Sequence, residues 1–295
     1  MVRCPSCGAN SAKLGEIPAA TVFAGRTLSP PLSGGDLFCC LGCSLWFRWP
    51  QLTKAKMDEL YAAGCDDTWE EQPANRPDWI LASEVLAGTV PGSVLDVGCF
   101  DGGFLSTLGP DRQRYGIEIQ PEAADKARRR GVNVIGSDFS AINGSYNAIV
   151  AFDVIEHVTD PAAFLRQLVD SITPAGMVII STGNTRSWWW RLVKGNYWYC
   201  QFPEHISFIN PGWCTRQAKQ LGVVATVYRF SRFGRSLPEK LRGFAINVLY
   251  RILPALKVLG LKPSSGKLGR LDREGPPVGL ANDHMLVTFQ KTPSS

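Results

Sequence analysis

The stretch Ser93-Val-Leu-Asp-Val-Gly-Cys-Phe-Asp-Gly102 decides the fold of this chain. The apolar run over 93–97 predicts a short buried strand, and the glycines after it predict a tight turn into a helix. Glycine tolerates unusual backbone dihedral angles and lets the backbone come close to a ligand. The stretch therefore predicts a strand–turn–helix unit with a ligand site above the turn.

Apolar runs alternate with amphipathic segments on both sides of this unit. Further strands are predicted over 114–118, 132–135, 146–152, 176–181, 223–230 and 284–289. Helices are predicted from Pro121 to a stop at Gly131, after Asp160-Pro161, and over 211–221. Strands that alternate with helices at this spacing build a doubly wound α/β fold around a parallel sheet.

Acidic residues follow two of the predicted strands, where such sheets bind ligands. Glu118 ends the second strand and can accept hydrogen bonds from both hydroxyls of a ribose. Asp138 follows the third strand, where an adenine edge would lie. A dinucleotide fingerprint needs G-x-G-x-x-G, but Phe100 stands at the middle glycine and would crowd a pyrophosphate. The pattern favours a nucleoside cofactor without phosphate.

The ordered motifs resemble those of the class I S-adenosylmethionine-dependent methyltransferases. Val94 to Gly102 resembles motif I, Gly116-Ile-Glu118 the second-strand motif, and Ser137-Asp-Phe139 the adenine-contacting motif. Ala151-Phe-Asp-Val-Ile-Glu-His157 is similar to the fourth-strand motif of the subgroup that includes the ubiquinone O-methyltransferases. The resemblance covers residues 91–230 and the final strand. Phe100 departs from it, because many members have glycine there.

This resemblance implies a Rossmann-like, mostly parallel seven-stranded sheet with an antiparallel last strand. It also implies that S-adenosylmethionine supplies a methyl group to a nucleophile aligned by the protein. The residues that it implies for cofactor binding are Asp96, Gly98, Cys99, Phe100, Asp101, Gly102, Glu118, Ile119, Ser137, Asp138, Phe139, Phe152 and Asp153.

Two of the three histidines lie where an acceptor substrate is expected. His157 ends the fourth-strand motif, and His205 ends Pro203-Glu204-His205 after the fifth strand. Histidine titrates near neutral pH, so it suits the deprotonation of a hydroxyl. We expect His205, aided by Glu204, to be the general base. His157 is either a second catalytic residue or a core histidine, and the pair Glu156-His157 can also hold a divalent metal.

Two C-x-x-C knuckles, Cys4-Pro-Ser-Cys7 and Cys40-Leu-Gly-Cys43, indicate a structural zinc site. Cys39 is an alternative ligand or a spare thiol, and residues 16–36 must bulge out between the knuckles. Residues 45–50 also resemble the ending of zinc knuckles that precede certain methyltransferase domains. We therefore expect a zinc-ribbon-like module over 1–50, a helical linker over 51–90 and a methyltransferase domain over 91–291.

Composition limits the class of protein and its partners. The 295 residues are 45% hydrophobic and 19% charged, which suits a globular core. The net charge of +5 is mild, so no nucleic-acid partner is expected. The first residues lack an apolar signal core, and no apolar run is long enough to span a bilayer. These features favour a protein located in the reducing cytoplasm.

The aromatic segment 187–199 and the basic insert 231–281 leave several roles open. A lid or core contact is favoured, with a peripheral membrane or lipid-linked substrate contact and a homodimer interface as alternatives. The function expected overall is O-methylation of a small sugar-like or aromatic acceptor. The alternatives are a sugar C-methyltransferase and a partner protein that holds the cofactor without turnover.

Overall fold

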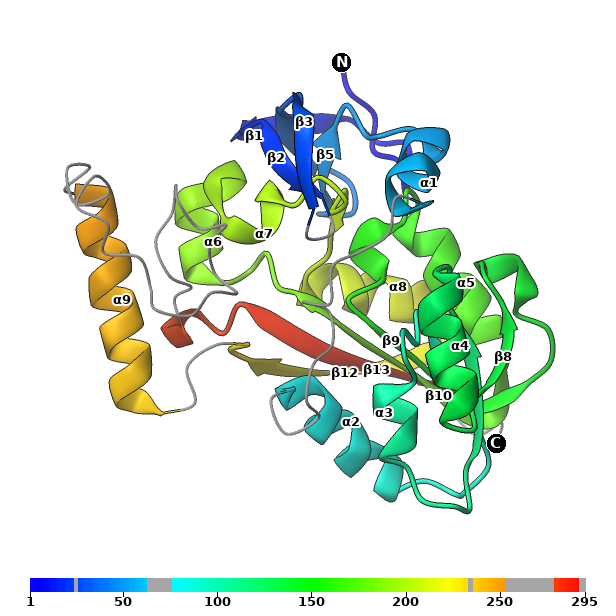
Figure 1. The fold of residues 1–295 in the computed structure, drawn as a ribbon. Coiled ribbons are helices and arrows are strands. Elements are labelled where there is room, and N and C mark those ends of the chain that lie inside the picture. Colours follow the sequence, from blue (N-terminus) through cyan, green and yellow to red (C-terminus); the bar gives the residue numbers. More distant parts are fainter. Residues whose placement is uncertain (24–25, 63–75, 233–235, 253–278, 292–295) are drawn as a thin grey trace.

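The computed structural model describes residues 1–23, 26–62, 76–232, 236–252 and 279–291. A seven-stranded sheet forms its centre, in the spatial order β12-β13-β10-β9-β6-β7-β8 (Figure 1). In chain order, its strands are β6 (Ser93–Val97), β7 (Gln113–Ile117), β8 (Asn133–Gly136), β9 (Tyr146–Phe152), β10 (Ile172–Gly183), β12 (Val223–Phe230) and β13 (His284–Lys291). Strands β6 to β10 are mutually parallel, and β13 runs antiparallel to β10 and β12. The predicted fold class is confirmed.

Helices cover both faces of this sheet. On one face lie α2 (Pro77–Ala87), α3 (Gly103–Ser106) and α4 (Pro121–Arg129), which pack Leu86, Phe104 and Ala127 over Val94 and Val150. On the other face lie α5 (Pro161–Asp170) and α8 (Pro211–Leu221), which pack Leu165 and Trp213 over Leu95 and Ile149. Alternate residues of each central strand therefore enter opposite cores, as a sheet buried on both sides requires.

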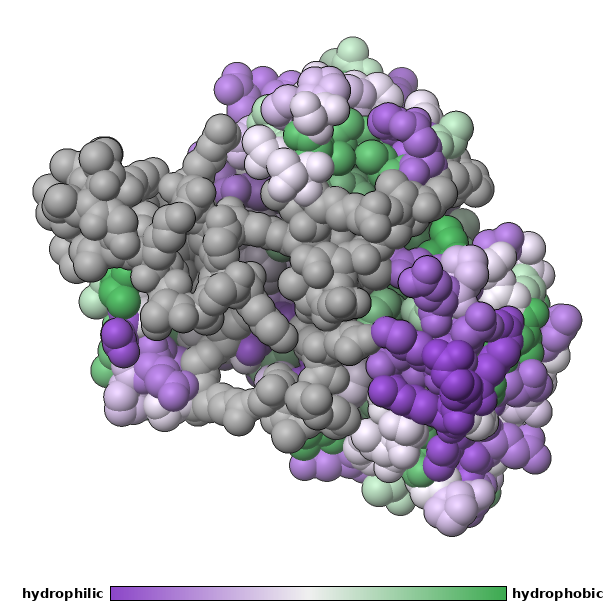
Figure 2. Space-filling model, viewed as in Figure 1, coloured by the Kyte–Doolittle hydropathy of each residue, from purple (hydrophilic) through white to green (hydrophobic). Residues whose placement is uncertain are grey.

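Most predicted element boundaries agree with the structure to within a residue or two. Proline occupies the first turn of α2, α4, α5 and α8, where its missing amide hydrogen leaves no helical bond unmade. Gly131, with φ +81°, follows α4, and the side chain of Asp160 caps α5 by accepting from the amides of Ala162 and Ala163. Strand β10 is longer than the predicted 176–181. Figure 2 shows hydrophilic residues gathered over α4, whose last turn carries Lys126, Arg128 and Arg129.

The N-terminal module is a second, smaller sheet in the order β1-β4-β5-β11. It consists of β1 (Ser11–Ile17), β4 (Gly35–Cys40), β5 (Trp46–Trp49) and the two-residue β11 (Ser207–Phe208). The predicted bulge over 16–36 contains the separate hairpin of β2 (Ala20–Phe23) and β3 (Arg26–Leu32), and α1 (Lys54–Ala62) follows the module. Strand β11 is distant in sequence from β1, β4 and β5 but pairs with β5. The N-terminal module and the region around His205 therefore share one sheet.

A buried guanidinium reinforces this junction. Arg48 on β5 donates to the backbone carbonyls of Cys200 at 2.6 Å, Phe202 at 3.3 Å and His205 at 3.3 Å. Its own amide donates to the carbonyl of Ile206 at 3.0 Å. Arg48 is 4% exposed, so these bonds satisfy donors that water does not reach. The N-terminal module therefore fixes the path of the loop that carries His205.

The aromatic segment 187–199 packs mainly against the N-terminal module. It forms α6 (Trp188–Val193), the short 3₁₀ turn η5 (Lys194–Asn196) and α7 (Trp198–Gln201). Trp189, Trp190, Tyr197 and Tyr199 are buried there in one core cluster with Leu37. The core-packing role expected for this segment is thus observed for these rings.

Helix α9 (Leu237–Ile252) belongs to the basic insert and lies at one side of the molecule (Figure 1). The 3₁₀ turn η6 (Gly279–Ala281) leads from the insert into β13. Phe244 of α9 contacts Trp188 and Trp189, with ring centroids 5.9 and 6.0 Å apart. The kink expected at Pro254 lies outside the described residues. Within the described ranges, no helix has the length and apolarity needed to cross a bilayer.

Candidate functional site

The turn after β6 has the strained backbone that a close ligand contact requires. Gly98, Phe100 and Gly102 have φ angles of +77°, +46° and +78°. A side chain at Gly98 would place its Cβ 2.8 Å from Val154 Cγ2, so glycine is needed there for space as well as conformation. Phe100 adopts the left-handed region although it has a Cβ, which costs about 1–2 kcal/mol. Although phenylalanine replaces glycine at this position, the backbone keeps the left-handed conformation typical of glycine.

Glu118 stands directly above this turn. Its carboxylate accepts from the backbone amides of Phe100 and Gln120, each at 2.8 Å. Burial raises the pKa of Glu118, and these amides oppose that effect. The Glu118 amide donates to the carbonyl of Gly136 at 3.1 Å, which brings the end of β8 beside the turn. The predicted ribose-binding acid is thus fixed and oriented at the carboxyl edge of the sheet.

The other acids of the predicted cofactor site have different environments. Asp96 is buried, and burial and the neighbouring Glu118 raise its pKa well above the usual value. Asp101 pairs with Arg130 at 2.6 Å and accepts from the amide of Gly103 at 2.9 Å, so it shapes the turn. Asp138 accepts from the amide of Ser140 at 2.8 Å and caps the 3₁₀ turn η3 (Phe139–Ala141).

The remaining predicted cofactor residues line the same edge. Ser137 and Ile119 are exposed beyond β8 and β7, Cys99 is buried, and Phe139 and Phe152 are half-buried. Phe139 packs on Phe164, with ring centroids 4.7 Å apart.

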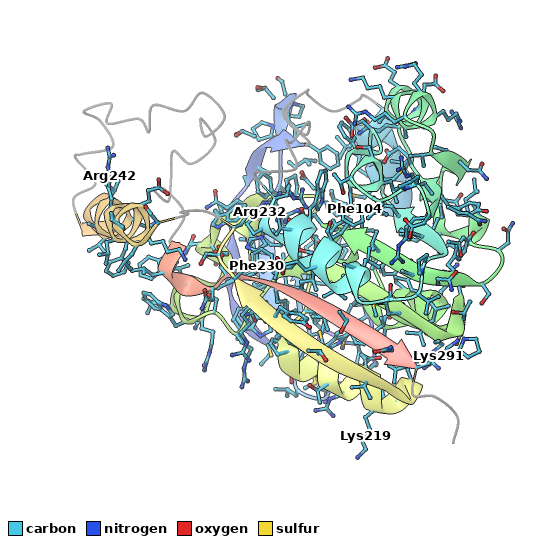
Figure 3. All side chains as sticks on the ribbon, turned by 90° about the horizontal axis from the view of Figure 1, so that it is seen from below. Phe104, Lys219, Phe230, Arg232, Arg242 and Lys291 are labelled. Carbon is cyan, nitrogen blue, oxygen red and sulfur yellow. The ribbon has the colours of Figure 1, made fainter. Side chains whose placement is uncertain are left out.

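Asp153 lies at the end of β9 in a network that the sequence did not reveal. Its Oδ2 accepts from Arg76 Nη2 at 3.0 Å and from Arg232 Nη1 at 2.5 Å. Burial would raise the pKa of Asp153, but the two guanidiniums outweigh it and lower the pKa. Asp153 has φ +54°, a second strained backbone position at this edge. In Figure 3, Arg232 and Phe230 lie at one end of β12, and Lys291 lies at the opposite end of the sheet.

Arg76 joins this network to the helical segment before the sheet. It donates to both carboxylate oxygens of Asp78, at 2.9 and 2.6 Å, and lies over the ring of Trp79 at 5.1 Å. Arg76 and Arg232 are functional candidates that sequence reasoning missed. The only local signal was that Arg76 stands just before the proline that begins α2.

Glu156, His157 and His205 come together in the structure. The imidazole centroids lie 4.8 Å apart, and one ligand atom from each of the three residues lies within 4.8 Å of the others. Glu156 and His157 belong to the 3₁₀ turn η4 (Ile155–His157), directly after β9. The Glu156 carboxylate accepts from the hydroxyls of Tyr199 and, at 2.9 Å, Thr182.

Backbone carbonyls orient both rings. His157 Nδ1 lies 3.1 Å from the carbonyl oxygen of Glu204, and His205 Nδ1 lies 2.9 Å from that of Tyr199. A carbonyl only accepts, so Nδ1 carries the hydrogen and Nε2 keeps its lone pair in the neutral rings. Glu204, predicted to aid His205, thus reaches His157 through its backbone. The role of its carboxylate remains a prediction.

Burial adjusts the protonation of this cluster. It raises the pKa of Glu156 to about 7, with help from the charge of Asp153. It lowers the pKa of His157, and together with the neighbouring His157 it lowers that of His205 well below the usual value. The cluster therefore favours two neutral imidazoles and a carboxyl that holds its proton more firmly than an exposed one. Such a set can accept a proton or hold a divalent cation.

The four predicted zinc ligands also converge. The Sγ atoms of Cys4, Cys7, Cys40 and Cys43 all lie within 4.8 Å of one another. Cys4 and Cys43 are 3.7 Å apart and Cys7 and Cys40 are 3.4 Å apart, near the edge of about 3.8 Å expected for sulfurs around a tetrahedral zinc. The amides of Gly42 and Cys43 donate to Cys40 Sγ, each at 3.3 Å. Cys39, the alternative ligand, lies outside this group.

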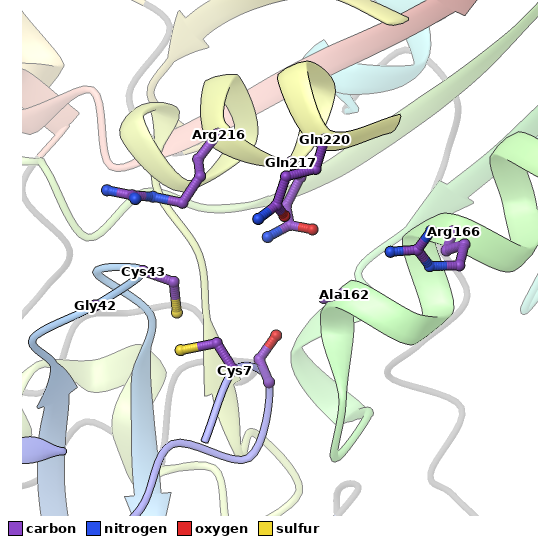
Figure 4. A pocket seen from close by; sticks show the side chains of 9 residues that line it. Cys7, Gly42, Cys43, Ala162, Arg166, Arg216, Gln217 and Gln220 are labelled. Carbon is purple, nitrogen blue, oxygen red and sulfur yellow. The ribbon is translucent and has the colours of Figure 1, made fainter. Parts of the chain in front are cut away.

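A cavity of about 540 Å³ separates the cysteine cluster from α5 and α8. Arg166 and Arg216 lie on two sides of it, with Cys7 and Cys43 at its other wall (Figure 4). A metal ion held by four thiolates carries net negative charge, and these guanidiniums are placed to offset it. We therefore interpret the cavity as part of the electrostatic surroundings of the cluster.

Several buried polar atoms at the carboxyl edge lack a protein partner. Within the described ranges no hydrogen-bond partner is found for Trp79 Nε1, Asp96 Oδ1, Asp153 Oδ1 or Ser181 Oγ. Buried polar groups are nearly always paired, by a ligand or water when not by protein. The edge offers Glu118 to a ribose, unpaired carboxylate oxygens to an ammonium group and Arg76 to a carboxylate. The residues present therefore fit S-adenosylmethionine.

Comparison with known proteins identifies the family of this chain. A family model described as a methyltransferase domain matches residues 56–225. A ubiquinone biosynthesis O-methyltransferase of Bordetella bronchiseptica is 30% identical over 198 residues, covering 59% of this chain and 80% of the relative. One of Serratia proteamaculans is 28% identical over 183 residues, covering 54% and 76%.

A solved structure supports the fold alone. It is a complex of the Haloferax volcanii Trm112 methyltransferase activator with a methyltransferase, and it matches with a TM-score of 0.51 and 13% identity. The match covers 72% of this chain and 90% of the other.

Replacing Glu118 tests the cofactor site. Glu118→Ala removes an oriented carboxylate, so we expect affinity for S-adenosylmethionine to fall about 10- to 100-fold, as for loss of hydrogen bonds to a charged group. Titration calorimetry with S-adenosylmethionine measures this. Glu122→Ala, on the exposed side of α4, is the matched control. Equal affinity in both variants, with both folded by circular dichroism, would remove Glu118 from the site.

Proposed function

We propose that this chain, which belongs to the class I S-adenosylmethionine-dependent methyltransferases, methylates a hydroxyl oxygen of a small-molecule acceptor. The observation that carries this proposal is the cluster of Glu156, His157 and His205 directly after β9. A hydroxyl must lose its proton as the methyl group arrives, and this cluster supplies lone pairs at the edge where the cofactor is expected. The relatives named as O-methyltransferases support oxygen as the acceptor atom.

When bound, the cofactor supplies an electrophilic methyl group on a positively charged sulfur. The protein has to hold the acceptor oxygen in line with that methyl group and exclude water. His157 Nε2 and His205 Nε2 are the groups that can hold the hydroxyl, and Glu156 lies beside them and accepts from the Tyr199 hydroxyl. The identification of His205 as the base stays a prediction.

Aromatic rings surround this region and support an aromatic or sugar-like acceptor. Phe202 lies 5.1 Å from the His205 ring, and Trp198 lies 5.8 Å from Phe202. Both side chains are only half-buried. Flat rings of this kind stack on aromatic acceptors and on the apolar faces of sugars.

His205→Ala tests the cluster. We expect turnover to fall about 10²- to 10⁴-fold, the usual contribution of acid–base catalysis, with unchanged affinity for S-adenosylmethionine. The measurement is release of the demethylated cofactor with pools of hydroxylated aromatic compounds and sugars as acceptors. Gln201→Ala, in the same loop, is the control. Full turnover in His205→Ala would contradict the role of this cluster, and cofactor binding with no transfer to any acceptor would favour a non-catalytic partner protein.

We further propose that the four-cysteine cluster holds a structural zinc ion, because all four positions around the metal would be filled by protein sulfur. Purified protein should contain one zinc per chain, measured by mass spectrometry of the metal. Cys40→Ser should lose it and melt at a lower temperature. Cys39→Ser is the matched control, since its sulfur lies outside the cluster. Equal metal loss in both variants, or metal-free wild-type protein, would contradict this site.

A surface formed by α6 and α9 supports peripheral contact with an anionic membrane or a lipid-linked acceptor. Trp188, Leu192, Leu237 and Leu241 are 48%, 66%, 63% and 51% exposed. Exposed Arg191, Lys194 and Arg242 accompany them. Basic residues beside exposed apolar ones are typical of surfaces that bind anionic lipid.

Co-sedimentation with phosphatidylserine vesicles tests this surface. Wild-type protein should pellet with the vesicles, and Leu192→Glu with Leu241→Glu should abolish pelleting. Val224→Glu, an exposed change on β12, is the control. If wild-type protein stays in solution and the double variant instead dissociates a dimer on gel filtration, the surface is a homodimer interface and the membrane proposal is wrong.

A further inference from the structure

The third histidine of the chain, His284, lies at the carboxyl edge although no motif marks it. It is the first residue of β13 and pairs in register with Gly183 of β10 and Phe230 of β12. Because β13 is antiparallel to its neighbours, its first residue lies where β10 ends. His284 therefore belongs to the edge that carries Asp153.

The His284 ring is buried with both nitrogens unpaired. It is 1% exposed, and neither Nδ1 nor Nε2 has a hydrogen-bond partner in the described parts of the chain. Trp198 stacks on the ring at 6.0 Å, with Tyr199 at 5.3 Å and Phe230 at 6.0 Å. An unpaired buried nitrogen is unfavourable, which points to a group that it meets when a ligand is bound.

Asp283 lies beside one nitrogen of this ring. His284 Nδ1 is 3.2 Å from Asp283 Oδ1, an ion-pair contact that does not have hydrogen-bond geometry, and the Tyr197 hydroxyl donates to Asp283 Oδ2. The amide of Asn184 donates to the Asp283 carbonyl at 2.7 Å and fixes the backbone. Although burial would raise the pKa of Asp283, His284 and Tyr197 lower it. A carboxylate beside Nδ1 keeps the hydrogen on that nitrogen and the lone pair on Nε2.

We propose that His284, oriented by Asp283, takes the proton that the acceptor hydroxyl loses during methyl transfer. The inference rests on the proposed function. In the step, the hydroxyl O–H bond breaks and its proton passes to His284 Nε2. The oxygen forms a bond to the methyl carbon, and the C–S bond breaks with its electron pair going to sulfur. The products are the methyl ether, the demethylated cofactor and an imidazolium.

The surroundings of His284 favour this role over the same role for His205. Asp283 Oδ1 lies 3.2 Å from His284 Nδ1, whereas His205 Nδ1 meets only a neutral backbone carbonyl. A proton received by His284 therefore arrives beside a carboxylate. The Tyr199 ring lies 5.3 Å from the His284 ring, the Tyr197 hydroxyl bonds Asp283, and Arg76 and Arg232 bind Asp153.

With His284 as the base, His157 and His205 have a separate role. Nε2 of His157 and His205 can hold the acceptor oxygen while His284 receives its proton. The half-buried Trp198 ring stacks on His284 and is the nearest group through which the acceptor would have to pass.

The pH dependence of turnover distinguishes the two histidines. With saturating S-adenosylmethionine, wild-type kcat should fall in acid as the base becomes protonated. We expect His284→Asn to lower kcat at least 100-fold and to remove this acid limb. His205→Asn should lower kcat but keep the limb. The opposite pattern, or a limb that survives His284→Asn, would overturn the proposal.

A second measurement needs no acceptor. In ¹⁵N-histidine-labelled protein the three imidazoles give three sets of ring signals, and His284→Asn identifies one of them. At pH 8 we expect His284 to carry hydrogen on Nδ1 alone, and Asp283→Asn to shift hydrogen towards Nε2. A wild-type His284 with hydrogen on Nε2 would overturn the proposal. Absence of methyl transfer by wild-type protein would instead count against the proposed function, and this ring assignment would still be decided.

Discussion

The guanidinium of Arg48 connects the two halves of this molecule. It is buried in the N-terminal sheet, yet all three of its described acceptors are carbonyls of the loop between residues 200 and 205. On the opposite side of that loop, the amide of Ile206 donates to the carbonyl of Glu156 at 2.8 Å. The position of His205 relative to Glu156 is therefore set from both sides. Since Cys40 and Cys43 flank the turn that leads into β5, a metal there would stabilise the strand that carries Arg48. This arrangement gives a physical reason for a cysteine cluster remote in sequence from the histidines at the carboxyl edge of the sheet.

A second constraint acts at the centre of that edge. Asp153 gathers Arg76, from the segment before α2, and Arg232, from the segment after β12, onto one carboxylate oxygen. Buried charge networks usually contribute more to orientation than to net stability, because desolvation offsets their attraction. The left-handed backbone at Asp153 is consistent with that interpretation, since strained conformations persist where the surroundings determine them. The network leaves Asp153 Oδ1 unpaired among the described residues.

Features encoded by local sequence could be predicted, and features made by distant pairs could not. The turn at Gly98 and the dipeptide Glu156-His157 after β9 each depend on residues close in sequence, so their patterns could be recognised. Arg76 and Asp153 are 77 residues apart, and nothing near either residue indicates the other. Strand β11 has only two residues, too few for a periodic signal.

Whether Cys39 or Cys40 joins the cysteine cluster could be decided only from the directions of their side chains in β4. Successive side chains in a strand point to opposite faces, so only one of the two neighbours in β4 can reach the cluster. The third histidine was missed for a similar reason. The position of His284 at this edge is evident only in the folded sheet, where the antiparallel strand β13 brings it beside the ends of β9 and β10.

Charge couples the expected cofactor site to the acceptor site. The negative charge of Asp153 is one of the causes that raise the pKa of Glu156 to about 7. A cation bound near Asp153 would screen that charge, so it would lower the pKa of Glu156 and favour its ionised form. The sulfonium and ammonium groups of S-adenosylmethionine are cations of this kind. Cofactor binding should then increase the negative charge beside His157 and His205, which makes both imidazoles better acceptors of a hydrogen bond from the acceptor hydroxyl. Binding of the methyl donor and binding of the acceptor would therefore be coupled through the charge at this edge.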